Sequence, residues 1–239
     1  MDLTQVSSTV WQLAFPLGHV HFVRLPDGYA LIDTAVPGSA PTILDALARL
    51  GGRSQDLRQI VLTHSHIDHT GSAAALVEAT GARVLAGALD APFIRGTAPE
   101  PEPVYTVPER ALHEQIMEGF SAADVRPLQR VPVDVELHDG DTIDDWSEPV
   151  HVLHVPGHTP GSIALHLASS GVLFPGDIVA TTEGRAILGP FNVDRDQAVA
   201  SFRRLASLEV EALCVPHGEP VLKGAGEVLR AATPENDWL

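Results

Sequence analysis

Thr63-His64-Ser65-His66-Ile67-Asp68-His69-Thr70-Gly71 is the stretch of sequence that decides the fold. It places three histidines and one aspartate within six residues. The apolar run before it, residues 59–62, predicts a buried strand, and the run after it, residues 71–77, predicts a helix. In α/β sheets, ligands bind outside the carboxyl ends of the strands. The stretch therefore predicts an α/β protein with a binding site where this strand ends.

The spacing of the four polar side chains favours a metal site. Residues i and i+2 of an extended segment point to the same side, so His64 and His66 can face one ion. Where the chain bends into the helix, Asp68 and His69 point to a neighbouring place. Neutral imidazole suits zinc, iron or copper, and a carboxylate adds a hard oxygen donor. A polar loop with chance histidines is the alternative, and four ligand-type residues in six make it a poor explanation.

The pattern His-x-His-x-Asp-His after a strand resembles the first motif of the metallo-β-lactamase fold superfamily of metal-dependent hydrolases. Three later motifs resemble the rest of the family's pattern and occur in the family's order. They are Pro-Gly-His-Thr-Pro-Gly-Ser at 156–162, Phe-Pro-Gly-Asp at 174–177 and Val-Pro-His-Gly at 215–218. The resemblance covers most of the chain and implies a four-layer αβ/βα sandwich of the metallo-β-lactamase type. It specifies the metal centre far better than the substrate.

The resemblance also implies a dinuclear centre. One metal would be held by His64, His66 and His158, the other by Asp68, His69 and His217, and Asp177 would bridge both. Two divalent ions are expected, zinc first, with manganese, cobalt or iron as alternatives.

Such a centre supplies its own nucleophile. Two cations can share one hydroxide, because metal binding lowers the pKa of water from about 15.7 toward about 7. Asp177 would fix the metal separation. Asp68 would orient the hydroxide or carry its proton to the leaving group, so these two residues are the candidate catalytic carboxylates.

Other polar residues are candidates for the surroundings of the site. In the resembled family Asp33 would lie near the metals, but a strand-end carboxylate in a turn explains it equally well. Thr63 and Thr159 are candidate hydrogen-bond partners of the ligands. The remaining seven histidines lack motif support and are expected to be structural or exposed, with the first two able to approach the cleft from the N-terminal strands: His19, His21, His113, His138, His151, His154 and His166.

The rest of the chain reads as alternating elements of one domain, residues 1–239. Strands are predicted at 10–13, 20–23, 30–33, 82–86 and 150–155, and a hairpin at 162–174 that delivers Asp177. A further strand reaches His217. Helices are predicted at 39–50, 196–205 with Asp194 as cap, and 225–232.

Residues 91–130 interrupt this alternation with six prolines and predict an insertion, with a helix near 108–117. In the resembled family this region covers the metal cleft. Its apolar residues could line a substrate pocket, although for each one taken singly, anchoring of the insertion to the core is the better interpretation: Phe93, Ile94, Tyr105, Ile116, Met117 and Phe120. The role of Tyr105 and the movement of the insertion as a lid stay open.

Net charge, cysteine content and the N-terminal sequence limit which partners and which compartment are expected. The net charge of -16 over 239 residues disfavours nucleic acid, whose phosphates attract Lys and Arg. Cys214 is the single cysteine and reads as a core thiol. The N-terminus predicts neither a signal peptide nor a membrane span, so a cytoplasmic protein acting on a small molecule is expected. Its oligomeric state is left open, including a homo-oligomer.

The motifs favour hydrolysis without naming the substrate. The length, the seven ligands and the insertion resemble N-acyl homoserine lactonases, which open a lactone. Neither Tyr29 nor Tyr105 matches the position of the tyrosine that such enzymes present to the substrate. A thioesterase resembling glyoxalase II is the alternative, although only 22 residues follow His217. A β-lactamase, a mono-iron sulfur oxygenase and a non-catalytic binding module are disfavoured, because Asp177 is present and all seven ligand positions are filled.

Overall fold

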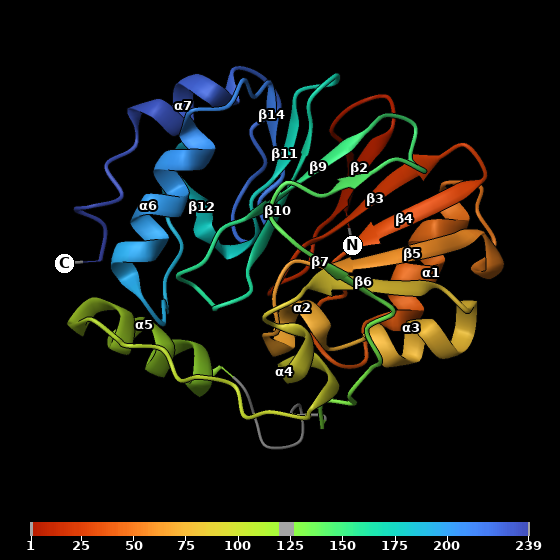
Figure 1. Cartoon of the computed structure of the whole chain (residues 1–239), viewed down its shortest axis with the longest axis horizontal. Coiled ribbons are helices and arrows are strands. Elements are labelled where there is room, and N and C mark those ends of the chain that lie inside the picture. Colours follow the sequence, from red (N-terminus) through yellow and green to blue (C-terminus); the bar gives the residue numbers. More distant parts are fainter. Residues whose placement is uncertain (1, 120–126, 239) are drawn as a thin grey trace.

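The computed structural model describes residues 2–119 and 127–238. Two sheets pack face to face, with helices on their outer faces (Figure 1). The larger sheet runs in chain order through seven strands: β1 (Leu3–Gln5), β2 (Val10–Leu13), β3 (Val20–Leu25), β4 (Gly28–Ile32), β5 (Leu57–Leu62), β6 (Arg83–Gly87) and β7 (Val135–Leu137). The pairs from β1 to β4 are antiparallel and those from β4 to β7 are parallel.

The second sheet has five strands in the order β14 (Ala212–Leu213), β11 (Val172–Phe174), β10 (Ile163–Leu167), β9 (Val150–His154) and β8 (Thr142–Ile143). A separate hairpin, β12 (Val179–Thr182) with β13 (Arg185–Leu188), follows the second sheet's β11. The sequence reasoning missed this hairpin and β1. It also did not foresee that the turn at 139–141 crosses from β7 of one sheet to β8 of the other.

Alternating side chains build three apolar layers. On β5, Val61 faces the second sheet, where Phe174 belongs to the same buried cluster. Ile60 faces the other way and packs with Ile43 of α1 (Ala40–Arg49). This period of two is the strand signature. It gives the first sheet one face toward the second sheet and one toward the helices.

The outer layers are helical. α1 and α3 (Ala73–Thr80) cover the first sheet, and α6 (Arg195–Ala206) and α7 (Ala225–Ala231) cover the second (Figure 1). Asp194 caps α6 as predicted, because its Oδ1 accepts a hydrogen bond from the Gln197 backbone N at 3.0 Å. The predicted four-layer αβ/βα sandwich is confirmed.

The insertion begins later than predicted. Residues 91–95 form α4 (Ala91–Arg95), in which Ala91 and Ile94 are buried in the cluster below the first sheet. The irregular part therefore starts after the left-handed Gly96. It leads to α5 (Val107–Glu118), which lies below α6 and apart from the two sheets (Figure 1). Phe120 is outside the described residues.

In the two described ranges we find no helix that combines the length and the apolar character needed to cross a membrane.

Candidate metal centre

The first motif forms a sharp transition from strand to helix. β5 ends at Leu62, and α2 (Ile67–Thr70) begins inside the motif, earlier than the predicted helix. His66 caps α2 in an extended conformation, with φ -62° and ψ 152°. The His64 Nε2 and His66 Nδ1 atoms lie 3.2 Å apart. The predicted same-side arrangement of the two imidazoles is therefore present.

A third imidazole completes this group. His158, from the loop between β9 and β10, places its Nε2 2.9 Å from His66 Nδ1. The ligand-type nitrogens of His64, His66 and His158 all lie within 4.8 Å of one another. Tetrahedral zinc with Zn–N bonds of 2.0–2.1 Å separates two nitrogens by about 3.3 Å. The three-histidine group thus has the spacing of a metal site.

A second group lies beside the first. Asp68, His69 and His217 also bring their ligand-type atoms within 4.8 Å of one another. Asp68 Oδ2 lies 3.5 Å from His69 Nε2 and 3.3 Å from His217 Nε2. This is the set of residues that the motifs assign to the other metal.

Asp177 lies between the two groups. Its Oδ2 is 3.4 Å from His158 Nε2 on one side and 3.2 Å from His217 Nε2 on the other. Its Oδ1 is 3.2 Å from His69 Nε2. Asp177 comes from the short turn between β11 and β12, so it enters the site from the second sheet. All seven residues predicted as ligands therefore meet in one place.

The donor atoms fit a pair of cations. His69 Nε2 and Asp177 Oδ1 are buried and have no hydrogen-bond partner among the described residues. Although they lie 3.2 Å apart, they do not form a hydrogen bond with each other. Burial would lower the pKa of His69, but the carboxylates of Asp177, Asp68 and Asp33 outweigh burial and raise it well above its ordinary value. The same carboxylates call for positive charge, which divalent ions would supply in place of protons.

The three-histidine group has the opposite electrostatics. Burial, the largest effect, lowers the pKa of His158 to about 3, and burial together with His69 lowers that of His64 well below its ordinary value. Both side chains are therefore neutral near pH 7. Neutral imidazole is the form that ligates a metal.

Asp33 forms hydrogen bonds that connect it to both groups, directly to His69 and through Thr63 to His64. Its Oδ2 accepts hydrogen bonds from His69 Nδ1 at 2.9 Å and Thr63 Oγ1 at 2.8 Å, and its Oδ1 accepts one from Thr63 N at 2.8 Å. Thr63 Oγ1 in turn lies 3.1 Å from His64 Nδ1. Of the two interpretations of Asp33, the structure supports the partner of the site. Its φ of +59° is uncommon for a residue with a side chain.

Asp90 is a buried residue of this region that the sequence reasoning missed. It sits directly before α4, where Asp followed by Ala and Pro predicts nothing more than a helix cap. Its carboxylate instead contacts the loops that carry His64, His66 and His158.

The seven other histidines lie outside the two groups. His19 contacts the loop of the second group, because its Nε2 bonds with the Gly218 carbonyl at 3.1 Å, one residue after His217. His21 is instead in the core and bonds to Gln12 Oε1. His154 and His166 bond with backbone carbonyls through their Nε2 atoms. The others pack on or face the surface: His113, His138 and His151.

The insertion contacts the first motif and the loop after β13. Ser65 Oγ donates a hydrogen bond to the Glu100 carboxylate, and Glu109 of α5 accepts one from the Phe191 backbone N at 3.0 Å. Tyr105 packs against Phe191, with ring centroids 5.7 Å apart. For Ile94 and Tyr105 the anchoring interpretation describes the observed contacts, whereas Met117 is exposed.

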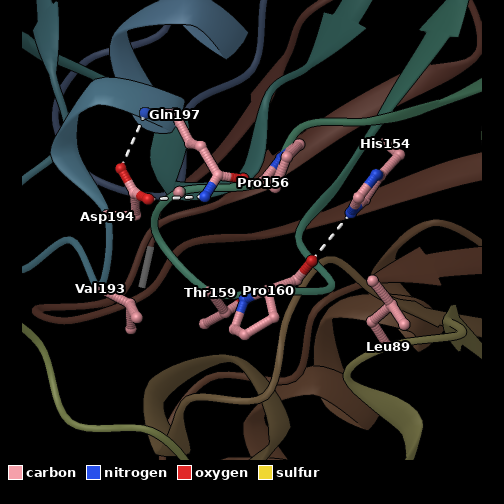
Figure 2. A pocket seen from close by; sticks show the side chains of 9 residues that line it. Leu89, His154, Pro156, Thr159, Pro160, Val193, Asp194 and Gln197 are labelled. Atoms are coloured by element: carbon pink, nitrogen blue, oxygen red, sulfur yellow. Dashed lines mark hydrogen bonds between the residues drawn. The ribbon is translucent and has the colours of Figure 1, made fainter.

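A shallow, mainly apolar hollow of about 200 Å³ adjoins the His158 loop. Figure 2 shows its rim, with Asp194 and Gln197 of the α6 N-terminus on one side and Leu89 on the other. Gly157 and Thr159, the neighbours of His158, line its floor together with Pro160. The hollow lies beside the ligand groups and contains none of the seven ligand side chains.

Comparison with known proteins agrees with this geometry. The family model described as the metallo-beta-lactamase superfamily matches residues 15–217. The chain belongs to this superfamily. Structurally it is similar to BJP-1, a subclass B3 metallo-beta-lactamase of Bradyrhizobium japonicum, with a TM-score of 0.68 and 22% identity over 96% of this chain and 89% of that one. That likeness shows the superfamily fold.

Curated superfamily members are similar in sequence as well. A hydroxyacylglutathione hydrolase of Cereibacter sphaeroides is 34% identical, covering 94% of this chain and 74% of that protein. The probable metallo-hydrolase YflN of Bacillus subtilis is 29% identical, covering 91% and 86%.

Proposed function

We propose that this protein is a dinuclear metal-dependent hydrolase that opens a lactone or a related ester. The observation that carries the proposal is the meeting of seven ligand-type side chains from four separate segments around Asp177. Membership of the superfamily supports hydrolysis as the reaction type.

Two bound divalent ions would supply Lewis acidity and a water of lowered pKa at neutral pH. The two aspartates of the site differ in exposure, and we assign them different roles for that reason. The Asp177 side chain is 8% exposed, whereas that of Asp68 is 24% exposed. Asp177 would hold the two groups together, and Asp68 would exchange a proton with water or with the leaving group at the open side.

The charge beside the site favours an uncharged substrate. The Glu100 carboxylate accepts a hydrogen bond from Ser65, the residue between His64 and His66 in the sequence. A carboxylate there repels an anion such as a glutathione conjugate and leaves a neutral lactone or ester unaffected. The partly buried rings of Tyr105, in the insertion, and Phe191, in the loop after β13, would offer apolar contact to such a substrate.

A thioesterase resembling glyoxalase II is the second candidate. It is supported by the hydroxyacylglutathione hydrolase of Cereibacter sphaeroides, whose similarity extends over nearly the whole chain. Both reactions use the same metal chemistry, so only the substrate can separate them.

The test compares kcat/KM for an N-acyl homoserine lactone and for a glutathione thioester of similar acyl size, on protein of verified metal content. We expect the lactone to be preferred and Asp68→Asn to lose most of the turnover. His151→Ala is the control, because His151 is exposed on β9. A preference for the thioester would establish the second candidate, and no turnover of either would contradict ester-type hydrolysis.

A further inference from the structure

We propose that Asp90 is a positioning residue for the three-histidine site: it holds the loop of His64 and His66 in register with the loop of His158. The inference rests on the proposed metal centre and assigns a role to a residue outside the four motifs.

Asp90 is fully buried, and its carboxylate accepts three hydrogen bonds. Oδ2 accepts from Ser65 N at 2.9 Å and from Thr159 Oγ1 at 2.7 Å, and Oδ1 accepts from Gly161 N at 2.7 Å. Ser65 separates His64 from His66, and Thr159 follows His158. One carboxylate thus joins both loops that carry the three imidazoles.

Asp90 gives up a local interaction to make these contacts. It is the residue before α4, a position where aspartate usually caps the helix by bonding to the N2 or N3 backbone. Here the side chain makes no such cap bond. Its carboxylate is directed to residues 25, 69 and 71 positions away, which indicates a role in joining the loops.

The hydrogen-bond directions around Asp90 are fixed. A carboxylate only accepts, so the Thr159 hydroxyl donates to it. Thr159 Oγ1 also lies 2.7 Å from Ser162 Oγ, and because the Thr159 proton is used, Ser162 must donate to Thr159. Ser162 Oγ then accepts from the Thr159 backbone N at 3.2 Å. The residue next to His158 is thereby held by hydroxyl and backbone together.

The second motif packs closely on the backbone of Asp90. A Cβ on Gly161 would come 2.1 Å from the Asp90 backbone N, which real side chains do not allow. The absence of a side chain at Gly161 lets the Pro-Gly-Ser end of the second motif lie directly on the Asp90 loop. The three bonds to Asp90 can then form at normal length.

Asp90 and Asp33 serve different parts of the centre. Asp33 bonds directly to His69 of the second group and reaches His64 of the first group through Thr63, whereas Asp90 reaches the three-histidine group through Ser65 and Thr159. Loss of the Asp90 carboxylate should therefore weaken one metal site selectively. A general structural role would not discriminate between the two sites.

The test is a metal titration of Asp90→Asn with competition by a chelator, using zinc, and cobalt absorption to report which site fills. The asparagine keeps one oxygen acceptor, but its NH2 group faces N–H or O–H donors of the two loops and cannot accept their hydrogen bonds. We expect one site to bind about 10- to 100-fold more weakly, the range for outer hydrogen-bond partners of metal ligands, and the other to change little. kcat should recover at saturating metal.

Two further variants make the result decisive. Asp134→Asn is the matched control, because Asp134 Oδ2 also accepts from a backbone N, that of Val84 at 2.8 Å, but away from the site. If Asp90→Asn does not fold, Thr159→Val removes one of the three bonds and should weaken the same site to a smaller extent.

Unchanged affinity, or equal loss at both sites in a folded Asp90→Asn protein, would overturn the role of Asp90. Unchanged affinity in Thr159→Val would do the same if the asparagine variant is unfolded. Failure of the wild-type protein to bind two metals would instead overturn the proposed function on which this inference rests. The two failures are thus distinguishable.

Discussion

Replacement of Asp33 by asparagine tests whether Asp33 fixes the His69 tautomer that binds the second metal. The protonated His69 of the metal-free site must lose one proton to bind a metal. Asp33 Oδ2 only accepts, so it keeps the remaining proton on Nδ1 and leaves the lone pair on Nε2, which faces Asp177. In Asp33→Asn an NH2 group takes the place of that oxygen. It donates to Nδ1 and favours the tautomer whose Nε2 carries the proton, which cannot bind a metal. Asparagine tolerates the φ of +59°, so the backbone is not the cause of any loss.

The size of the effect follows from these contacts. Outer partners of metal-ligating histidines are worth about 10- to 100-fold in metal affinity, or about 1.4–2.7 kcal/mol. The metal-free protein should also lose roughly 1.5–3 kcal/mol of unfolding free energy, the value of a hydrogen bond to a charged group. Both losses fall within what chelator competition and urea denaturation resolve.

The assay is a zinc titration of wild type and Asp33→Asn, with Asp45→Asn on the exposed face of α1 as control. We expect the Asp33 variant to retain one tight site and lose the other. If it binds two ions with wild-type affinity, the reasoning about the His69 tautomer is refuted.

Three further predictions concern the insertion, the substrate and pH. Glu109→Gln should lower the unfolding free energy by about 1–3 kcal/mol, because both oxygens of this buried carboxylate accept backbone N–H groups; an unchanged urea midpoint would contradict this. Glu100→Gln should shift the kcat/KM ratio toward the glutathione thioester by about fivefold, the effect of one screened charge of ~1 kcal/mol, and an unaltered ratio would remove Glu100 from specificity. Burial lowers the pKa of His21 to about 3, so only the unfolded chain binds this proton between about pH 6.5 and pH 3. Stability of the metal-free protein should therefore fall with decreasing pH across that window by about 1.4 kcal/mol per unit from this group, and His21→Gln should remove that part of the slope.

Four of the seven ligand-type residues were predictable because their information is local, whereas His158, Asp177 and His217 were assigned through the motifs that resemble the superfamily. His64, His66, Asp68 and His69 lie within six residues, and the strand-to-helix change fixes where they point. The four-layer sandwich was implied by the resemblance of the motifs, and the alternation in β5, where Ile60 and Val61 face opposite layers, agrees with it. For Asp33 the sequence left two interpretations, and the hydrogen bond to His69 decided between them.

Long-range contacts could not be read in the same way. Asp90 carries the signal of a helix cap, and nothing in its neighbourhood predicts a bond to Gly161. The turn at 139–141 lies between two strand-like runs, and the sheet that each run joins depends on the distant partners of β7 and β8. Prolines on both sides place Ile94 with the insertion, yet the buried face of α4 packs it into the core. In each case tertiary packing gave a new role to a segment whose local pattern was ordinary.

The most direct test of the central claim is the metal content of reconstituted wild type and Asp177→Ala, measured together with hydrolysis of the lactone. Two ions per chain in the wild type are predicted, with lower occupancy and strongly reduced turnover in the variant, because Asp177 lies between the two ligand groups. A single iron per chain, no bound metal in a folded wild type, or full turnover in Asp177→Ala would contradict the dinuclear hydrolase.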